Sequence, residues 1–233
     1  VINRQKDTAL PPGTYYVRIV EDPDAGHDVI FSYTLSVSAQ PSDIVNTSPQ
    51  GVIGETGKVT ITQANSSSWK TITLQHTFKD PVVIAGPLSF NGSDPATIRI
   101  RNVKSNSFQV QVDEWDYLDG SHTEETFSYF VMESGVYVLG NGVQLIAGQV
   151  DTNQNWSTLY FPSKFDDQPV VLSQVQTANG SSAVVTRHRA SSGSGFEVRL
   201  QEEESNDGTH SVETVGYLAM TQSGGSLSGI DYE

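Results

Sequence analysis

The stretch that decides the fold is residues 96–115, ATIRIRNVKSNSFQVQVDEW, in which two alternating segments flank a short polar turn. A period of two is typical of a β-strand with one face in a core and the other in water. In the second segment Phe108, Val110 and Val112 share one face, and polar residues share the other. The stretch therefore predicts two half-buried strands of the kind found where two sheets pack face to face.

The same pattern recurs 88 residues later, in residues 184–203, VVTRHRASSGSGFEVRLQEE. Further pairs keep this offset: Pro81 with Pro169, Arg99 with Arg187, Arg101 with Arg189, Phe108 with Phe196, His122 with His210, Glu125 with Glu213 and Tyr129 with Tyr217. Chance rarely holds one register across so many residue types, so the chain contains one domain of about 90 residues twice.

Each repeat is expected to fold as an antiparallel β-sandwich of about six strands, which makes the chain all-β. A hydrophobic fraction of 36% suits thin sandwiches, because alternate residues of each strand face water. Repeat one is assigned to residues 51–135 and repeat two to residues 136–228. The strands expected in repeat one are Val59–Thr62, Thr71–Thr77, Pro81–Ala85, Thr97–Asn102, Phe108–Trp115 and Thr126–Met132. Gly135–Gly142 is either a linker or a strand that continues into repeat two.

Residues 1–44 belong to neither repeat. Their alternating segments Gly13–Val20 and Val29–Ala39 predict a β-hairpin that ends a preceding β-sandwich. The segments PGTYYV (12–17) and YTLSV (33–37) resemble the closing strands of bacterial pre-peptidase C-terminal domains, which accompany secreted hydrolases. This resemblance implies that the chain comes from a bacterial, exported, multidomain parent.

The composition excludes several function classes. With 27 acidic and 13 basic side chains the net charge is −14, which repels phosphate backbones and anionic lipid. No apolar stretch reaches the roughly 20 residues that cross a bilayer. The absence of cysteine excludes disulfides and thiolate metal sites. We therefore expect neither nucleic-acid binding nor membrane insertion. No cofactor is expected either, although the acidic runs Asp113–Asp119 and Glu202–Asp207 leave calcium open against the favoured alternative of a solvated rim.

Repeat one resembles the H-type lectin domain. The similar features follow in order: Gly57-Lys58-Val59, Trp69, Pro81-Val82-Val83, Ile98-Arg99-Ile100, Phe108, the aromatic-polar segment Trp115–His122 and the closing strand Phe127–Met132. The order and spacing over about 80 residues carry the resemblance, and repeat two shows it more faintly.

This resemblance implies binding of galactose-type or N-acetylgalactosamine-type sugars by domains that often associate as trimers. The ligand-contacting arginine of that family falls on Arg99 and, by the repeat, on Arg187. Its aromatic loop falls on Trp115–His122, whereas the matching Glu203–His210 has no aromatic residue. The acidic loop that supplies an aspartate to the sugar is reduced to Ala64–Ser68, so the identity of the sugar does not carry over.

The candidate ligand-binding residues combine aromatic rings, which stack on the C–H faces of sugars, with polar groups that pair with hydroxyls. They are Arg99, Arg101, Trp115, Asp116, Tyr117, Asp119 and His122, with Arg187, Arg189 and His210 in repeat two. Two alternatives stay open: packing, with the arginines neutralising nearby carboxylates, and a metal role. His122 and Glu125 could bind zinc or relay protons. Residues three apart on a strand face opposite sides, however, which favours a structural or ligand-contacting histidine.

The sequence thus predicts a secreted, non-enzymatic pair of carbohydrate-binding modules whose partner is a glycan or polysaccharide, with homo-oligomers of a trimer type possible. The first alternative is a structural, oligomerisation or adhesion module without sugar binding. The second is an enzyme fragment, for which the sequence offers only scattered histidines and glutamates and no catalytic constellation.

Overall fold

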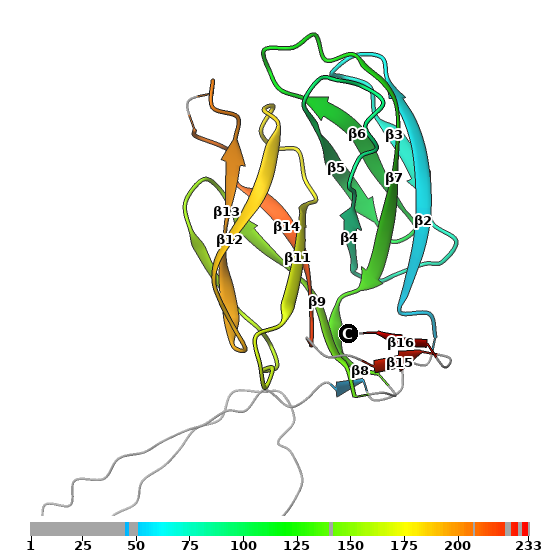
Figure 1. Cartoon of the computed structure of the whole chain (residues 1–233), viewed down its shortest axis with the longest axis vertical. Coiled ribbons are helices and arrows are strands. Elements are labelled where there is room, and N and C mark those ends of the chain that lie inside the picture. The colour runs from blue at the N-terminus through cyan, green and yellow to red at the C-terminus, as the bar shows by residue number, and fades with distance from the viewer. Residues whose placement is uncertain are drawn as a thin grey trace, which may run out of the picture. The chain divides into compact units, whose positions relative to one another are not determined.

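The computed structural model describes residues 45–46, 51–139, 142–206, 208–221, 225–227 and 230–232, and every regular element in them is a β-strand (Figure 1). These residues contain no helix that is long and apolar enough to cross a membrane. The contacts divide the chain into Val1–Asp43 and Ile44–Glu233, and the second unit contains both repeats. The predicted all-β class is confirmed. The hairpin predicted in residues 1–44 lies outside the described residues.

Repeat one contains six strands: β2 (Gly54–Gln63), β3 (Lys70–Thr73), β4 (Pro81–Ala85), β5 (Ala96–Lys104), β6 (Ser107–Glu114) and β7 (His122–Glu133). They form two antiparallel sheets with the orders β2-β7-β4 and β3-β6-β5. All six predicted strands occur. β3 ends earlier than predicted, because the backbone N–H groups of Gln75 and His76 donate to the Glu55 carboxylate instead of to a neighbouring strand.

The core of repeat one lies between these two sheets. Phe108, Val110 and Val112 are almost completely buried, so the alternation in residues 96–115 indicated the core face correctly. β7 supplies Phe127, Tyr129 and Val131 from the opposite sheet. Because both sheets contribute side chains to one cluster, the repeat is a β-sandwich.

Repeat two has the same plan. Its strands are β9 (Gln144–Thr152), β10 (Ser157–Tyr160), β11 (Val170–Val175), β12 (Val184–Ser192), β13 (Gly195–Glu202) and β14 (Glu213–Met220). β10, β13 and β12 form one sheet. β9, β14 and β11 belong to a second sheet, which β8 (Gly135–Val138) and β1 (Val45–Asn46) extend to five strands. β15 (Gly225–Leu227) pairs with β16 (Ile230–Tyr232).

The segment between the repeats is partly a strand of repeat two. β8 pairs antiparallel with β9, and Tyr137 lies opposite Leu145 in that register. The same strand pairs in parallel with β1. Residues 135–138, which the sequence leaves as a linker or a continuing strand, therefore extend the sheet of repeat two.

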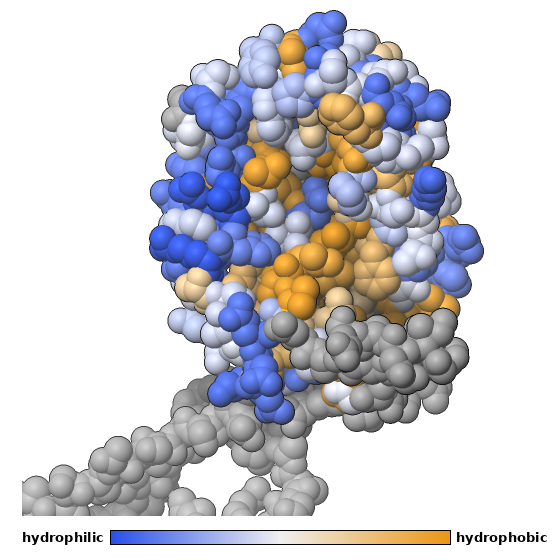
Figure 2. All heavy atoms as spheres, in the orientation of Figure 1, coloured by the Kyte–Doolittle hydropathy of each residue, from blue (hydrophilic) through white to orange (hydrophobic). Residues whose placement is uncertain are grey.

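An apolar cluster joins the two sandwiches. It contains Val82 and Met132 from repeat one and Ala147 and Leu218 from repeat two, with Tyr137 of β8. Gln176 reaches across to accept a hydrogen bond of 2.6 Å from the backbone N–H of Val83. Figure 2 shows apolar side chains in the middle of the visible face, with hydrophilic ones around them.

The approach between the sandwiches depends on a glycine. A Cβ atom at Gly216 would lie 2.1 Å from Oε1 of Gln176 and 3.0 Å from a methyl carbon of Val82. The equivalent position in repeat one is Ser128. Gly216 thus leaves room for the Gln176 side chain of its own repeat and for Val82 of repeat one.

Candidate functional site

A pocket of about 440 Å³ opens at the junction of the two sandwiches. Repeat one contributes most of its lining, and repeat two contributes Ala178, Gly180 and Ser181. Five of the predicted site residues line it: Arg99, Arg101, Trp115, Asp116 and Asp119. Two arginines of one strand, Arg99 and Arg101, thus line the same pocket as Trp115 of the aromatic loop.

Arg99 forms the floor of the pocket and also ties the repeats together. Its side chain is 2% exposed. One guanidinium nitrogen donates to Asp113 at 3.2 Å and to the backbone carbonyl of Ser182. The other donates to the carbonyl of Gly180 at 3.1 Å and lies 3.6 Å from a carboxylate oxygen of Glu213. Two of the three hydrogen bonds that this arginine donates thus go to repeat two.

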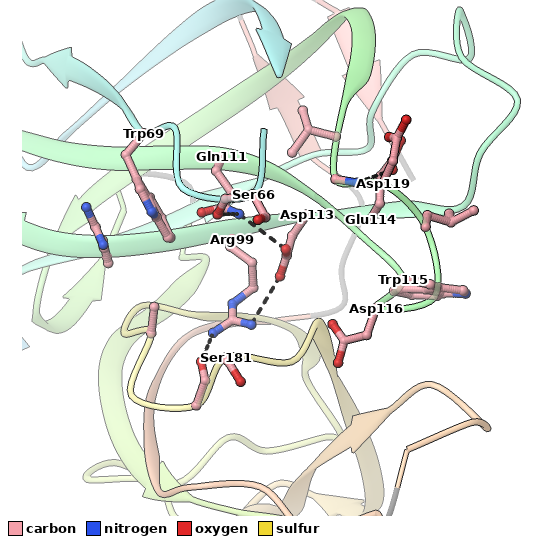
Figure 3. A pocket seen from close by; sticks show the side chains of 16 residues that line it. Ser66, Trp69, Arg99, Gln111, Asp113, Glu114, Trp115, Asp116, Asp119 and Ser181 are labelled. Carbon is pink, nitrogen blue, oxygen red and sulfur yellow. Dashed lines mark hydrogen bonds and ion pairs between the residues drawn. The ribbon is translucent and has the colours of Figure 1, made fainter. Parts of the chain in front are cut away.

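Two buried polar atoms of the floor have no hydrogen-bond partner among the described residues. They are Nε of Arg99 and Oε1 of Gln111. Gln111 donates through its nitrogen to Asp113 at 3.2 Å, and Figure 3 shows these three side chains grouped between the two indole rings. A buried donor or acceptor without a partner is costly, so water or a ligand hydroxyl at this floor would lower the free energy.

Asp113 has a perturbed acidity. Burial raises its pKa to about 6, and the charge of Asp116 acts in the same direction. The nearby Arg99 guanidinium opposes this change without cancelling it. Near neutral pH the floor of the pocket therefore combines one cation with one anion.

Two tryptophans lie at opposite ends of the pocket in Figure 3. The guanidinium of Arg101 lies 4.0 Å from the ring centre of Trp69 and donates to Gln109 at 2.9 Å. Trp115 begins the loop between β6 and β7 and is partly exposed. A sugar face or another flat apolar group could stack on either ring.

Repeat two also holds the loop that carries Trp115. The backbone N–H of Asp116 donates to Glu203 at 3.1 Å, and the amide of Asn206 donates to the Asp116 carboxylate at 2.8 Å. Tyr117 is 65% exposed and does not line the pocket. The segment Glu203–His210, which lacks an aromatic residue, thus supports the aromatic loop of repeat one.

His122 is buried beneath the pocket lining and does not line it. Its Nδ1 lies 2.7 Å from Glu114 and its Nε2 lies 3.3 Å from Glu125. A register shift in the β2–β7 pairing, between Ile61 and Gln63, brings residues 122 and 125 to the same side. A sequence argument based on strict alternation misses such a bulge.

His210 repeats this arrangement, at 2.8 Å from Glu202 and 3.1 Å from Glu213. Burial would lower the pKa of His210, but its bonds to Glu213 and Glu202 outweigh burial and raise it. Burial likewise opposes ionisation of Glu213, yet hydrogen bonds from His210, Gly180, Thr177 and Asn179 lower its pKa to about 2. The described residues contain no group of three or more side chains that could hold a metal ion.

Each buried glutamate fixes one loop, which we call the acceptor loop: residues 89–94 in repeat one and 177–182 in repeat two. Glu213 accepts from the backbone N–H groups of Asn179 and Gly180, both at 2.8 Å. Glu125 accepts from those of Asn91 at 2.8 Å and Gly92 at 2.7 Å. The duplicated histidine and glutamate thus act on the acceptor loop.

The site residues predicted in repeat two lie elsewhere. Arg187 is exposed and donates to Gln201 at 3.0 Å. Arg189 lies 4.2 Å from the ring centre of Trp156 and 2.5 Å from Glu197. Neither lines the pocket between the repeats. Arg99 and Arg187, which the duplication makes equivalent, thus have different surroundings in the described residues, because Arg99 donates to the other repeat and Arg187 donates to Gln201 of its own.

Trp69 and Gln111 line the pocket although neither was among the predicted site residues, and the same holds for the whole contribution of repeat two. Trp69 and Trp156 stand at nearly equivalent positions of the two repeats, and this recurrence was a usable signal for the ring that lies beside Arg101. No repeat pattern indicates which surface of one repeat contacts the other.

The fold and the pocket define an all-β protein of duplicated sandwiches with a pocket at their junction. The chain is similar to halomucin of Haloquadratum walsbyi, with 33% identity over 177 residues, which covers 70% of this chain and 2% of halomucin. The chain thus matches a very small part of that relative. No family model matches the chain, and no solved structure matches it. Membership of the H-type lectin family stays a prediction.

Proposed function

We propose that the chain is a non-catalytic glycan-binding module of a secreted protein, and that the pocket between the repeats holds the sugar. The observation that carries this proposal is the lining: indole rings at two ends and a polar floor of Arg99, Gln111 and Asp113 between them. Stacking rings with a few fixed polar groups are the usual means of binding carbohydrate. The unpartnered atoms of Arg99 and Gln111 support the need for an additional hydroxyl or water.

The similarity to halomucin supports the secreted location, since its name places that relative among the mucins, which are extracellular proteins. The net charge of −14 disfavours nucleic acid and anionic lipid as partners. Neutral glycans are free of that repulsion. The proposed partner is therefore a neutral or weakly charged glycan, and the identity of its sugars is left to the experiment.

A glycan array, followed by titration calorimetry on any glycan that binds, tests the proposal. Replacing a stacking ring should weaken binding at least tenfold, which corresponds to about 1.4 kcal/mol. Trp69→Ala and Trp115→Ala are the test variants. Trp156→Ala is the matched control, because it removes an indole that packs under arginines but lies outside the pocket. An equal loss in all three variants would contradict the assignment of the pocket.

The non-catalytic part of the proposal has a separate test. A glycan that binds should show no new reducing ends after prolonged incubation with the wild-type chain. Turnover that His122→Ala abolishes would instead favour an enzyme.

One observation favours a second candidate, a structural module. Arg99 falls, by the resemblance to H-type lectin domains, on the arginine that binds sugar in that family. Here it donates to two carbonyls of repeat two. If the glycan array stays blank while the two repeats unfold as one cooperative unit, the junction has a structural role and the pocket is a by-product of it.

A further inference from the structure

The contact between the two repeats has two different halves. Repeat one supplies a donor, Arg99 of β5, and repeat two supplies the acceptor loop, whose carbonyls at Gly180 and Ser182 accept from it. A contact in which each unit contributes a different surface is heterologous, and it leaves one half of each kind unused at the two ends.

The unused acceptor loop in repeat one is built as the used one is. Asn91 donates its side-chain amide to the Glu124 carbonyl at 2.8 Å, and Asn179 donates to the Val212 carbonyl at 2.8 Å. Glu125 holds the backbone N–H groups of this loop as Glu213 holds those of repeat two. The acceptor loop of repeat one is therefore held in position by the same bonds before any partner arrives.

The unused loop also differs in ways that suit docking. Phe90 is 86% exposed, and its equivalent Ala178 lines the pocket at the junction. Asp94, which is exposed, replaces Ser182 and adds a negative charge beside the carbonyl that would accept from an arginine. In the described part of the chain the only basic side chain paired with Glu125 is that of His122, whereas Glu213 also has Arg99 nearby.

The surface of repeat two that corresponds to the donor side of repeat one is unused, and we call it the donor surface: Arg187 with the apolar residues Val170 and Leu172. Arg187 is exposed, with Gln201 as its side-chain partner. Val170 and Leu172 are 43% and 46% exposed. Their equivalents in repeat one are Val82, which is completely buried in the cluster between the sandwiches, and Ile84, which packs against that cluster. The charged and the apolar parts of the donor surface thus recur together on repeat two.

We infer that this protein associates head to tail with a second copy of itself, in which Arg187 of one chain binds the acceptor loop of repeat one of the next. Arg187 would donate to the carbonyls of Gly92 and Asp94 and approach the carboxylate of Glu125. Phe90 would be buried against the donor surface of repeat two. A heterologous contact of this kind builds a ring or an open series rather than a two-fold dimer.

Analytical ultracentrifugation of the full chain, from about 10 μM to 1 mM, tests this inference. The solution contains 1 M NaCl, because screening suppresses the mutual repulsion of chains with a charge of −14. The wild-type chain should form species larger than a dimer. Arg187→Glu and Phe90→Asp, which alter the donor half and the acceptor half, should each lower the association constant at least tenfold. Lys164→Glu makes the same charge change at another exposed position and should associate like the wild type.

Mixing the two variants gives the sharpest result. The Arg187→Glu chain keeps an acceptor loop and the Phe90→Asp chain keeps a donor surface, so an equimolar mixture should stop at a dimer with one chain of each kind. Unchanged far-ultraviolet circular dichroism and melting temperature show that each variant is folded. A wild-type chain that stays monomeric at 1 mM or stops at a dimer would overturn the inference, as would variant chains that assemble like the Lys164→Glu control.

Discussion

The two repeats have the same six-stranded plan and the same buried histidine between two glutamates, yet the arginine at the matching position has opposite surroundings. Arg99 is 2% exposed and bridges to repeat two, whereas Arg187 is exposed. The two arginines differ in environment because only one of them faces a partner. The two repeats therefore share the strands and the buried histidine–glutamate groups that stabilise each sandwich. The environment of a surface residue such as Arg99 or Arg187 depends instead on whether it lies at the junction.

Replacing the buried glutamates extends this comparison and should give the largest change in the free energy of unfolding. Both hold an acceptor loop, but Glu213 also lies 3.6 Å from the Arg99 guanidinium. Glu213→Gln should cost about 3 kcal/mol, since it removes a buried charge from its partners. Glu125→Gln should cost less, about 2 kcal/mol, because it leaves no arginine behind. Urea unfolding followed by circular dichroism measures both, and equal losses would show that Arg99 contributes nothing through Glu213.

Acidification should give the next largest effect, through the same carboxylates. The folded-state pKa of Glu213 is about 2, below its ordinary value of 4.5, so the unfolded chain binds a proton more readily. Stability from this group is complete above pH 4.5 and is lost as the pH falls from 4.5 toward 2. The pKa of Glu125 is lowered in the same direction, again against the effect of its burial. Thermal unfolding at a series of pH values should show this loss, and Glu213→Gln should reduce the slope.

Asp113 should change stability with pH in the opposite direction to Glu213 in the same experiment. Its pKa is raised from 3.8 to about 6, so the folded state retains the proton longer than the unfolded state. Stability should therefore decrease modestly as the pH rises from about 4 to about 6. Asp113→Asn should remove that slope while leaving the acid limb in place. A slope that persists in this variant would assign it to another group.

The fold could be predicted from the sequence because it depends on local alternation and on the repeat. Phe108, Val110 and Val112 face the core as their period of two requires. The offset of 88 residues, which holds from Pro81 onward, places β12 and β13 at the positions of β5 and β6, whereas β10 begins 87 residues after β3. The strand ends were less predictable, because the carboxylate of Glu55 takes up backbone donors of residues 75 and 76 and so shortens β3.

The site was only half predictable for a different reason. Arg99 and Arg101 line one pocket because alternate residues of a strand share a face, and this followed from the period of two. The contribution of Gly180 and Ser181 depends on how two folded sandwiches dock, and single-residue patterns carry no such information. The pairing of His122 with Glu125 depends on a bulge between β2 and β7, which breaks the alternation that the prediction used.

The smallest expected effect is a difference in salt dependence between the two arginine–tryptophan pairs. Arg189 contacts Trp156 and also pairs with Glu197, at side-chain exposures of 53% and 25%, whereas Arg101 contacts Trp69 and the neutral Gln109. An exposed ion pair contributes about 0–1 kcal/mol and is screened by salt. The cost of Arg189→Met should therefore be below about 1 kcal/mol in 0.1 M NaCl and shrink in 1 M NaCl. The cost of Arg101→Met should be the same at both concentrations, because its partners carry no net charge. Urea unfolding at the two salt concentrations measures this, and an equal salt response in both variants would mean that Glu197 does not distinguish the two pairs.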